Sequence, residues 1–281
     1  MNAVIASGAD PQLEELEIRL LLEGVFRHYG YDFRNYAMSS LKRRIAKLVH
    51  VEKLGSISAL QEKVLRDESC MERLLLVLSI NVTSMFRDPL FYMAFRTQVV
   101  PYLRTYPFIR IWHAGCSTGE EVYSTAMLLH EEGLYDRTRI YATDMNDLVV
   151  KKAKEGIFPL ACMQQYTNNY LQAGGKRSFS EYYTANYDHA VFSPALKKNI
   201  IFAAHNLATD GSFNEFQVVF CRNVMIYFNK ALQERVHNLL YESMSMFGIL
   251  ALGARESIQF TPREAQYEPL DAVHKLNRKV R

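Results

Sequence analysis

Residues 109–121 of this chain read IRIWHAGCSTGEE, and this stretch decides the fold. Residues 109–113 nearly alternate apolar and polar side chains, with β-branched and aromatic residues among them, as a β-strand does. Gly115 and Gly119 then bracket a tight turn that side chains would obstruct. A strand joined to a helix by such a glycine loop predicts the first unit of a nucleotide-type α/β fold.

The polar residues of the loop predict how the helix begins and what the loop binds. Ser117 or Thr118 can cap the helix, and Glu120 or Glu121 can complete a capping box, which leaves one glutamate for a ligand. A dehydrogenase that binds a dinucleotide is a competing interpretation. Its fingerprint needs a glycine where Ser117 stands, however, and two acids would repel a pyrophosphate. The same acids would attract a cationic ligand such as the sulfonium of S-adenosylmethionine.

Composition narrows the class of protein. A chain of 281 residues with 49% hydrophobic residues can bury a sizeable core, and a net charge of +3 says little about partners. Its four cysteines are widely separated, which favours reduced thiols over a zinc site or disulfides. We find no signal-peptide pattern and no apolar run of the ~18–20 residues that a membrane span needs. We therefore expect a cytoplasmic monomer without metal, membrane insertion or nucleic acid.

Apolar spacing divides the chain into two expected domains. Residues 1–95 carry helical stripes and predict an N-terminal helical domain with a linker, and residues 96–281 follow as a second domain. The first helix is expected to gather its apolar residues on one stripe: Leu13, Leu16, Leu20, Leu21 and Phe26.

A basic stretch lies within the helical domain. Residues 34–53 hold six basic residues against the single acid Glu52, a local net charge of +5. This face is either solvated or a docking surface for an acidic partner, with Arg43, Arg44 and Lys47 as its centre. Nucleic acid is a weaker alternative, because aromatic residues for base stacking are sparse here.

Repeated strand–helix alternation predicts the architecture of the second domain. Further strands are expected over residues 139–144, 200–204, 216–221 and 248–253, in a parallel sheet with helices on both faces. Residues 158–198 interrupt the alternation and suit a small antiparallel insertion. Ligands of such sheets bind at the carboxyl ends of the strands. The residues that fall there are Gly115, Asp144, Asn206, Arg222 and Asn223.

Five motifs together resemble a known family, the CheR-type chemotaxis-receptor glutamate O-methyltransferases. They are NVTSMFRD at 81–88, AGCSTGEE at 114–121, ATD at 142–144, NL at 206–207 and CRNVMIYF at 221–228. The resemblance implies an N-terminal helical domain followed by a Rossmann-like methyltransferase domain with a small antiparallel β-subdomain. It also implies that the chain transfers a methyl group from S-adenosylmethionine to chemoreceptor glutamates, leaving S-adenosylhomocysteine.

The resemblance also assigns roles to individual residues. Glu121 and Asp144 would bind the methionine and ribose parts of the cofactor. The rest of the cofactor site would be formed by Asn81, Thr83, Arg87, Asn206, Leu207, Arg222 and Asn223. Arg87 is the best candidate to hold the substrate carboxylate, because its planar fork matches two oxygens, and Tyr227 is a plausible second donor.

Two departures and two alternatives accompany this interpretation. Val122 stands where the family usually has a proline, and Gln217 stands where an aspartate is frequent, but neither is a matched cofactor position. A methyltransferase with a different acceptor remains open. So does a sensor or scaffold that keeps the cofactor site without catalysis.

Overall fold

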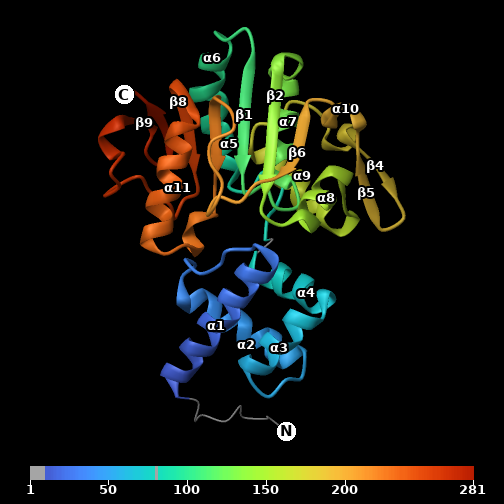
Figure 1. Ribbon diagram of the computed structural model, residues 1–281. Coiled ribbons are helices and arrows are strands. Elements are labelled where there is room, and N and C mark those ends of the chain that lie inside the picture. Colours follow the sequence, from blue (N-terminus) through green and yellow to red (C-terminus); the bar gives the residue numbers. More distant parts are fainter. Residues whose placement is uncertain (1–9, 80–81) are drawn as a thin grey trace. The chain divides into compact units, whose positions relative to one another are not determined.

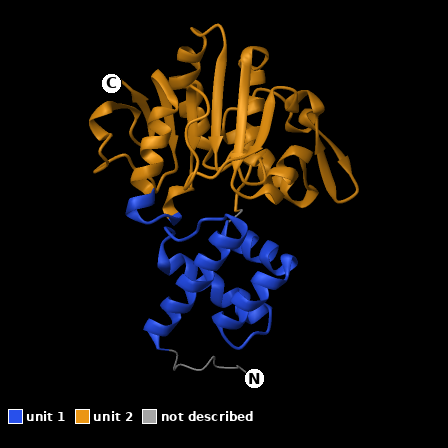
Figure 2. Cartoon of the chain, in the orientation of Figure 1, with its two compact units in different colours: residues 1–80, 227–232 blue, residues 81–226, 233–281 orange. Residues whose placement is uncertain are grey.

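The computed structural model describes residues 10–79 and 82–281. Two compact units divide the chain: Met1–Ile80 with Tyr227–Leu232, and Asn81–Ile226 with Gln233–Arg281 (Figure 2). This division falls earlier than the boundary near residue 95 that the sequence predicts. The reason is that Phe86, Phe91 and Phe95 pack into the hydrophobic core of the second unit.

Four helices make up most of the first unit: α1 (Pro11–Tyr29), α2 (Met38–Val51), α3 (Ile57–Arg66) and α4 (Glu68–Leu78). Side-chain caps begin three of them. Asp10, Ser56 and Asp67 accept backbone N–H groups in the first turns of α1, α3 and α4, respectively. α1 ends at Gly30, whose φ of 82° is the left-handed conformation that glycine adopts most easily.

The buried face of α1 differs from the predicted stripe. Leu13, Leu16 and Leu20 are 53%, 52% and 50% exposed, so the prediction was wrong for these three residues. At about 100° per residue they lie on the side of α1 opposite its core residues, and only one side of the helix packs against its neighbours. The buried residues of α1 are Ile18, Leu21, Leu22 and Val25.

Residues 227–232 come from far along the chain but belong to the first unit. The backbone N–H of Ala37 donates to the carbonyl of Tyr227 at 2.8 Å, and Asn229 N–H donates to the carbonyl of Asn35 at 2.9 Å. Tyr36 and Phe228 form an isolated antiparallel bridge, and their ring centroids are 5.0 Å apart. We call residues 227–232 the returning segment.

The second unit is built on a seven-stranded sheet of order β6-β2-β1-β7-β8-β10-β9 (Figure 1). The first five strands in this order run parallel, and β10 and β9 add to them in antiparallel fashion. The strands are β1 (Ile109–Ala114), β2 (Thr138–Asp144), β6 (Ile200–Ala204), β7 (Phe216–Cys221), β8 (Met244–Leu252), β9 (Tyr267–Asp271) and β10 (Leu276–Lys279).

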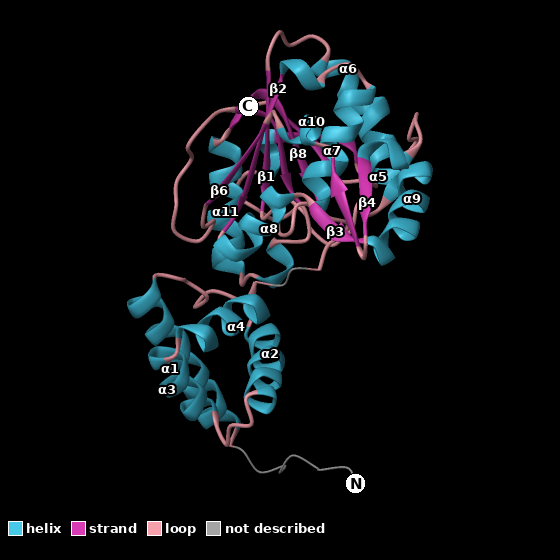
Figure 3. Cartoon of the chain, turned by 90° about the vertical axis from the view of Figure 1, so that its right-hand side faces the viewer, coloured by secondary structure: helices cyan, strands magenta, loops and turns pink. Residues whose placement is uncertain are grey.

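The predicted parallel sheet is confirmed, although β9 and β10 were not predicted. Helices cover both faces of the sheet, with α7 on one side and α11 on the other (Figure 3). A π-helical turn, Phe95–Val99, joins α5 to α6. The α-helices of this part of the chain are α5 (Pro89–Ala94), α6 (Val100–Leu103), α7 (Glu120–Glu131), α8 (Asp147–Glu155), α9 (Met163–Gln172), α10 (Pro194–Lys197) and α11 (Lys230–Glu242). Short 3₁₀ turns are Tyr135–Arg137, Leu160–Cys162, Phe179–Tyr182, Met225–Tyr227 and Glu264–Gln266.

The expected antiparallel insertion is also present. β3 (Ile157–Pro159), β4 (Tyr183–Asn186) and β5 (His189–Phe192) form a three-stranded sheet of order β3-β5-β4. Both pairings are antiparallel. Phe158 and Phe192 pack with Tyr123 of α7, so the insertion shares the core of the second unit.

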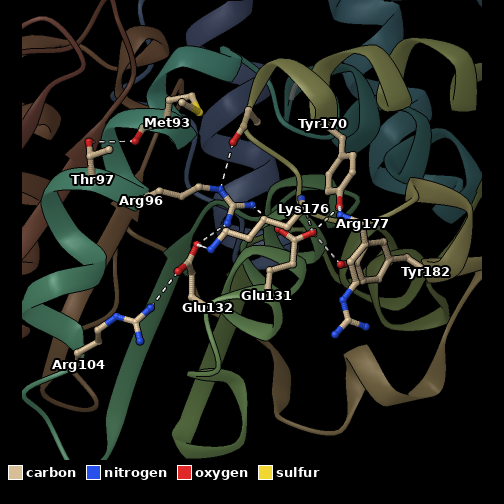
Figure 4. Close-up of polar contacts among 11 residues, drawn as sticks. Met93, Arg96, Thr97, Arg104, Glu131, Glu132, Tyr170, Lys176, Arg177 and Tyr182 are labelled. Carbon is tan, nitrogen blue, oxygen red and sulfur yellow. Dashed lines mark hydrogen bonds and ion pairs between the residues drawn. The ribbon is translucent and has the colours of Figure 1, made fainter.

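A buried ion-pair network fastens the segment before β4 to the end of α7 (Figure 4). Arg96 donates to Glu131 at 2.5 Å and to Glu132 at 2.7 Å, and the side chains of these residues are at most 8% exposed. Tyr170 and Tyr182 both donate their hydroxyls to Glu131. Since buried charges are costly unless they are paired and hydrogen-bonded, this network holds the insertion in one position relative to the sheet.

Candidate functional site

The glycine loop between β1 and α7 is shaped by close backbone approach. Gly115 has a φ of 78°, and a Cβ added there would lie 2.6 Å from Cγ2 of Val224. The N–H groups of Gly115 and Cys116 both donate to the carbonyl of Thr143, at 2.9 and 2.8 Å. Hydrogen bonds therefore hold the loop at the carboxyl end of β2, and the loop packs against the segment that follows β7. A residue larger than glycine would not fit at position 115.

The expected capping box is absent from α7. Gly119, with a φ of 95°, occupies the N-cap position, so no side chain caps the helix there. The hydroxyl of Thr118 instead donates to the side chain of Glu120 at 2.6 Å. Burial raises the pKa of Glu120 above its usual value, with the Thr118 hydrogen bond opposing the shift. The local spacing that suggests a capping box was overridden by the left-handed glycine.

Asp144 is the buried acid at the end of β2. Its Oδ2 accepts the N–H of Ser117 at 3.0 Å, and its Oδ1 accepts the N–H of Asn146 at 3.1 Å. Burial raises the pKa of Asp144 to about 6, although N–H donors from Asn146, Ser117 and Met145 oppose this. Asp144 is not a helix cap, because Asn146 caps α8 by accepting the N–H of Leu148.

A chain of charges crosses the carboxyl edge of the sheet. Arg222, whose side chain is 2% exposed, donates to Glu121 at 2.8 Å and to Asp88 at 2.9 Å. Its guanidinium also lies over the ring of Phe91, 3.9 Å from the centroid. Glu121 in turn contacts Nδ1 of His113 at 3.1 Å. Burial opposes ionisation of Glu121, but Arg222 and His113 outweigh it and lower the pKa of this carboxyl.

This charge chain makes a prediction about stability. Arg222→Leu is expected to lower the free energy of unfolding by about 2 kcal/mol, because Glu121 and Asp88 lose their shared partner. The value is set below that of a fully buried pair because the Asp88 side chain is 49% exposed. Urea unfolding measures it. As a matched control, Arg104→Leu removes an ion pair whose arginine is 53% exposed and should cost no more than about 0.5 kcal/mol. Equal losses in the two variants would contradict the prediction.

Other predicted site residues have different surroundings. Arg87 donates to the carbonyl of Val82 at 3.1 Å, and the Asp88 beside it is paired with Arg222 instead. Asn206 uses its side chain to accept the N–H of Ala208 in its own turn, and Leu207 is 7% exposed.

The remaining predicted residues are Thr83, Asn81 and Tyr227. Thr83 is half-buried, and Asn81 lies outside the described residues. Tyr227 belongs to the returning segment of the first unit, where the guanidinium of Arg44 lies 4.9 Å from its ring centroid.

Three residues of the site were not predicted. They are His113, Asp88 and Glu256, the last of which accepts four backbone N–H groups in and around the loop after β7. Each had a weak signal in the sequence, since His113 is a polar residue within β1, Glu256 follows β8, and Asp88 follows Arg87 within one motif. Asp88 pairs with Arg222, 134 positions away, and Glu256 accepts N–H groups 31 to 33 positions before it, whereas His113 contacts Glu121 only eight positions away.

Comparison with known protein families shows to which family the chain belongs. The family model described as "CheR methyltransferase, SAM binding domain" matches residues 81–273, and "CheR methyltransferase, all-alpha domain" matches residues 16–79. The chain belongs to the CheR methyltransferase family. Its second unit therefore contains a methyltransferase domain that binds S-adenosylmethionine.

Individual relatives agree with this assignment. "Putative methyltransferase Cher3" of Pseudomonas putida is 50% identical over 94% of this chain and 97% of its own. The "Chemotaxis protein methyltransferase" of Listeria monocytogenes is 28% identical over 83% of this chain and 87% of its own. A solved S-adenosylmethionine-dependent methyltransferase from Geobacter sulfurreducens, in complex with S-adenosyl-L-homocysteine, aligns with 64% of this chain and 54% of its own. Its sequence identity with this chain is 15%, and the TM-score is 0.35.

The residues at the carboxyl edge fit the cofactor of this family. Gly115 packs so closely against Val224 that a Cβ would not fit, and Asp144, Glu120 and Glu121 place carboxyl groups next to the loop. Ionised carboxyl groups accept hydrogen bonds from hydroxyl groups and attract a positive charge, and they repel a pyrophosphate. Within residues 10–79 and 82–281, no three His, Cys, Asp or Glu side chains are grouped to hold a metal ion, and no helix is long and apolar enough to cross a membrane.

Proposed function

We propose that this protein transfers methyl groups from S-adenosylmethionine to the side-chain carboxylates of glutamates on the helical cytoplasmic domain of a chemoreceptor. The observation that carries the proposal is the carboxyl-lined edge of the sheet, where Asp144 and Glu121 flank a glycine loop with no room for a larger residue. Membership of the CheR family supports the chemoreceptor as the acceptor.

Methyl transfer to a glutamate requires that the protein orient the reacting carboxylate, and it requires little acid–base catalysis. A solvated glutamate has a pKa of ~4.3, so it is already an ionised nucleophile at neutral pH. When bound, S-adenosylmethionine would supply a methyl carbon that a carboxylate oxygen can attack, while the bond from this carbon to the sulfonium breaks and S-adenosylhomocysteine leaves. Alignment of a bound nucleophile is worth several orders of magnitude in rate. In this proposal Asp144 and Glu121 hold the cofactor, and Asn206, Leu207 and Asn223 line the rest of its site.

Arg87 is the proposed positioning group for the acceptor carboxylate. Its guanidinium can donate two parallel N–H groups to two carboxylate oxygens. Its side chain is half-buried and makes no ion pair among the residues that the structure describes. Tyr227 stays a predicted second donor to the acceptor, and the returning segment that carries it belongs to the first unit. The arginine would position the nucleophile while leaving one lone pair of the reacting oxygen available.

The basic face of α2 is the proposed docking surface for the acidic receptor. Arg43 and Lys47 are exposed and one helical turn apart. Arg44 differs from them, because it donates to the carbonyl of Leu78 at 3.2 Å and lies over the ring of Tyr227. Burial lowers the pKa of Arg44, which agrees with an internal role. The proposal therefore rests on Arg43 and Lys47.

Charge reversal tests this docking surface. Arg43→Glu/Lys47→Glu is expected to raise the KM for the receptor roughly tenfold, because attraction becomes repulsion across the interface. The affinity for S-adenosylhomocysteine should stay the same. Arg19→Glu/Arg66→Glu is the matched control, since it reverses two exposed charges on α1 and α3. If both double variants methylate the receptor like the wild type, the α2 face is only solvated.

A methyl-transfer assay tests the proposed function directly. Methyl-labelled S-adenosylmethionine is supplied with receptor cytoplasmic fragments, and base treatment should release the label as methanol, as expected of a carboxyl methyl ester. Parallel reactions with RNA and with small-molecule extracts test other acceptors. Binding of S-adenosylhomocysteine without transfer to any acceptor would instead indicate a non-catalytic sensor.

A further inference from the structure

Glu256 is a buried carboxyl group to which the proposed mechanism assigns no task. It is 5% exposed and follows the carboxyl end of β8. Its Oε2 accepts the N–H groups of Gly253 at 2.7 Å and Asn223 at 2.8 Å. Its Oε1 accepts those of Val224 and Met225, both at 2.8 Å. A carboxylate has about four lone-pair positions, so these four donors use its full capacity.

The four donors belong to loops that leave two paired strands. Cys221 ends β7 opposite Leu252 of β8, so Gly253 and Asn223 begin neighbouring loops at the same edge. Asn223 has a φ of 61°, a left-handed conformation that is unfavourable for a residue with a side chain. A Cβ at Gly253 would lie 2.8 Å from the Asn223 nitrogen and 2.8 Å from Oε2 of Glu256. The two loops are thus drawn together around this carboxylate.

The loop held by Glu256 touches the cofactor edge at two places. Asn223 is one of the residues proposed to line the cofactor site. Val224, whose N–H is bound by Glu256, places its Cγ2 where a Cβ on Gly115 would meet it. Any shift of the 223–225 backbone would therefore displace both a cofactor ligand and the wall of the glycine loop.

We propose that Glu256 is a positioning residue for the methyl-donor site: its carboxylate holds Asn223 in the left-handed conformation, which fixes the position of the Asn223 side chain and packs Val224 against Gly115 of the glycine loop. This inference rests on the proposed use of this edge for S-adenosylmethionine. Burial raises the pKa of Glu256 above its usual value, and the four N–H donors oppose this shift.

Calorimetric binding of S-adenosylhomocysteine provides the main test. Glu256→Gln keeps the shape of the side chain but replaces one acceptor oxygen by an NH₂ group, which faces N–H donors. The affinity of the Glu256→Gln variant for S-adenosylhomocysteine is expected to fall at least about tenfold. The reason is that hydrogen bonds to a charged acceptor are lost while the backbone N–H donors stay buried. The matched control is Glu264→Gln, since Glu264 also accepts a backbone N–H, that of Phe260 at 2.8 Å, but from an exposed position. Its affinity should stay within about twofold of the wild type.

A double-mutant cycle separates positioning from general stabilisation. If Glu256 acts through Asn223, then Glu256→Gln should weaken binding little further once Asn223→Ala is present. A merely structural role predicts that the two losses multiply, and that result would overturn the proposal. An unchanged affinity in Glu256→Gln would overturn it as well. If the wild type fails to bind S-adenosylhomocysteine, the proposed function fails.

Hydrogen exchange of the wild-type protein tests, without any substitution, whether Glu256 holds the backbone of residues 223–225. The amides of Asn223, Val224 and Met225 should exchange slowly in the absence of ligand, because Glu256 accepts all three. Exchange as fast as that of exposed loop amides, such as those of residues 211 and 212, would refute the proposal even if Glu256→Gln does not fold. This measurement does not depend on cofactor binding. It therefore distinguishes failure of the role proposed for Glu256 from failure of the proposed function.

Discussion

Asp144→Ala is expected to weaken binding of S-adenosylhomocysteine roughly a hundredfold, because two hydrogen bonds from hydroxyl groups to a charged acceptor are lost. The substitution also removes the acceptor for the N–H groups of Ser117 and Asn146, which fixes the glycine loop to the turn after β2. Isothermal titration measures the affinity. Asp147→Asn is the matched control, since this exposed carboxyl lies in the first turn of α8 and should leave binding unchanged. An unaltered affinity in Asp144→Ala would remove Asp144 from the site.

The raised pKa of Asp144 gives the same prediction a pH signature. Burial holds this pKa at about 6, above the ordinary aspartate value. The folded protein thus binds the proton more tightly than the unfolded chain, so the carboxyl opposes folding above about pH 6 and this cost disappears as the pH falls toward its ordinary pKa of ~3.9. Ligand affinity should change in the opposite sense, since the ionised carboxylate binds hydroxyls. Wild-type affinity should fall below about pH 6, and Asp144→Asn should abolish that component.

Arg87→Ala is expected to lower kcat for receptor methylation by about a thousandfold while the protein stays folded, because the acceptor carboxylate loses its orienting partner. Arg87 stands in a strained stretch of backbone. It lies between Phe86 and Asp88, whose φ values of 48° and 59° are both left-handed. Strained backbone of this kind persists only where neighbours enforce it, and it gathers at functional sites.

The neighbours that enforce this turn are present on both sides. Phe86 is fully buried, and its N–H donates to the hydroxyl of Ser124 at 2.9 Å. Asp88 is paired with the buried Arg222. Steady-state kinetics with circular dichroism test the prediction, and Arg104→Ala serves as an exposed arginine control. Arg87→Lys should recover only part of the rate, since a point charge cannot replace the planar fork. Near-normal turnover in Arg87→Ala would exclude Arg87 from the mechanism.

Local sequence signals predicted much of the second unit. Near-alternation of apolar and polar residues located β1, and the almost continuous apolar run of β7 located a strand that is buried on both faces. Gly115 and Gly119 predicted the loop correctly, since a left-handed, closely packed turn excludes larger residues. The motifs around them also indicated the CheR family. β9 and β10 were not predicted, because their sequences, YEPLD and LNRK, carry many polar residues and resemble loops.

Other errors arose where a local signal competed with a distant partner. The α1 stripe was misassigned because Leu13, Leu16 and Leu20 are apolar at helical spacing, while the neighbouring helices pack against the opposite side. The capping box failed because Gly119 begins the helix itself. Arg44 stands in the same basic stretch as Arg43, yet only Arg44 contacts Leu78 and Tyr227. Spacing along one helix cannot say which residue meets another segment.

The sequence by itself determined the class of fold and the acidic character of the glycine loop, and it predicted a site at the carboxyl edge of the sheet, because these depend on residue type and on contacts between neighbours in the chain. Only the tertiary structure decided how the charges are shared. Arg222 pairs with Glu121 and Asp88, residues more than 100 positions away, and Glu256 binds a loop about 30 positions before it. Such pairings follow from the order of strands in the sheet, which brings distant chain segments to one edge and gives each buried charge its partner.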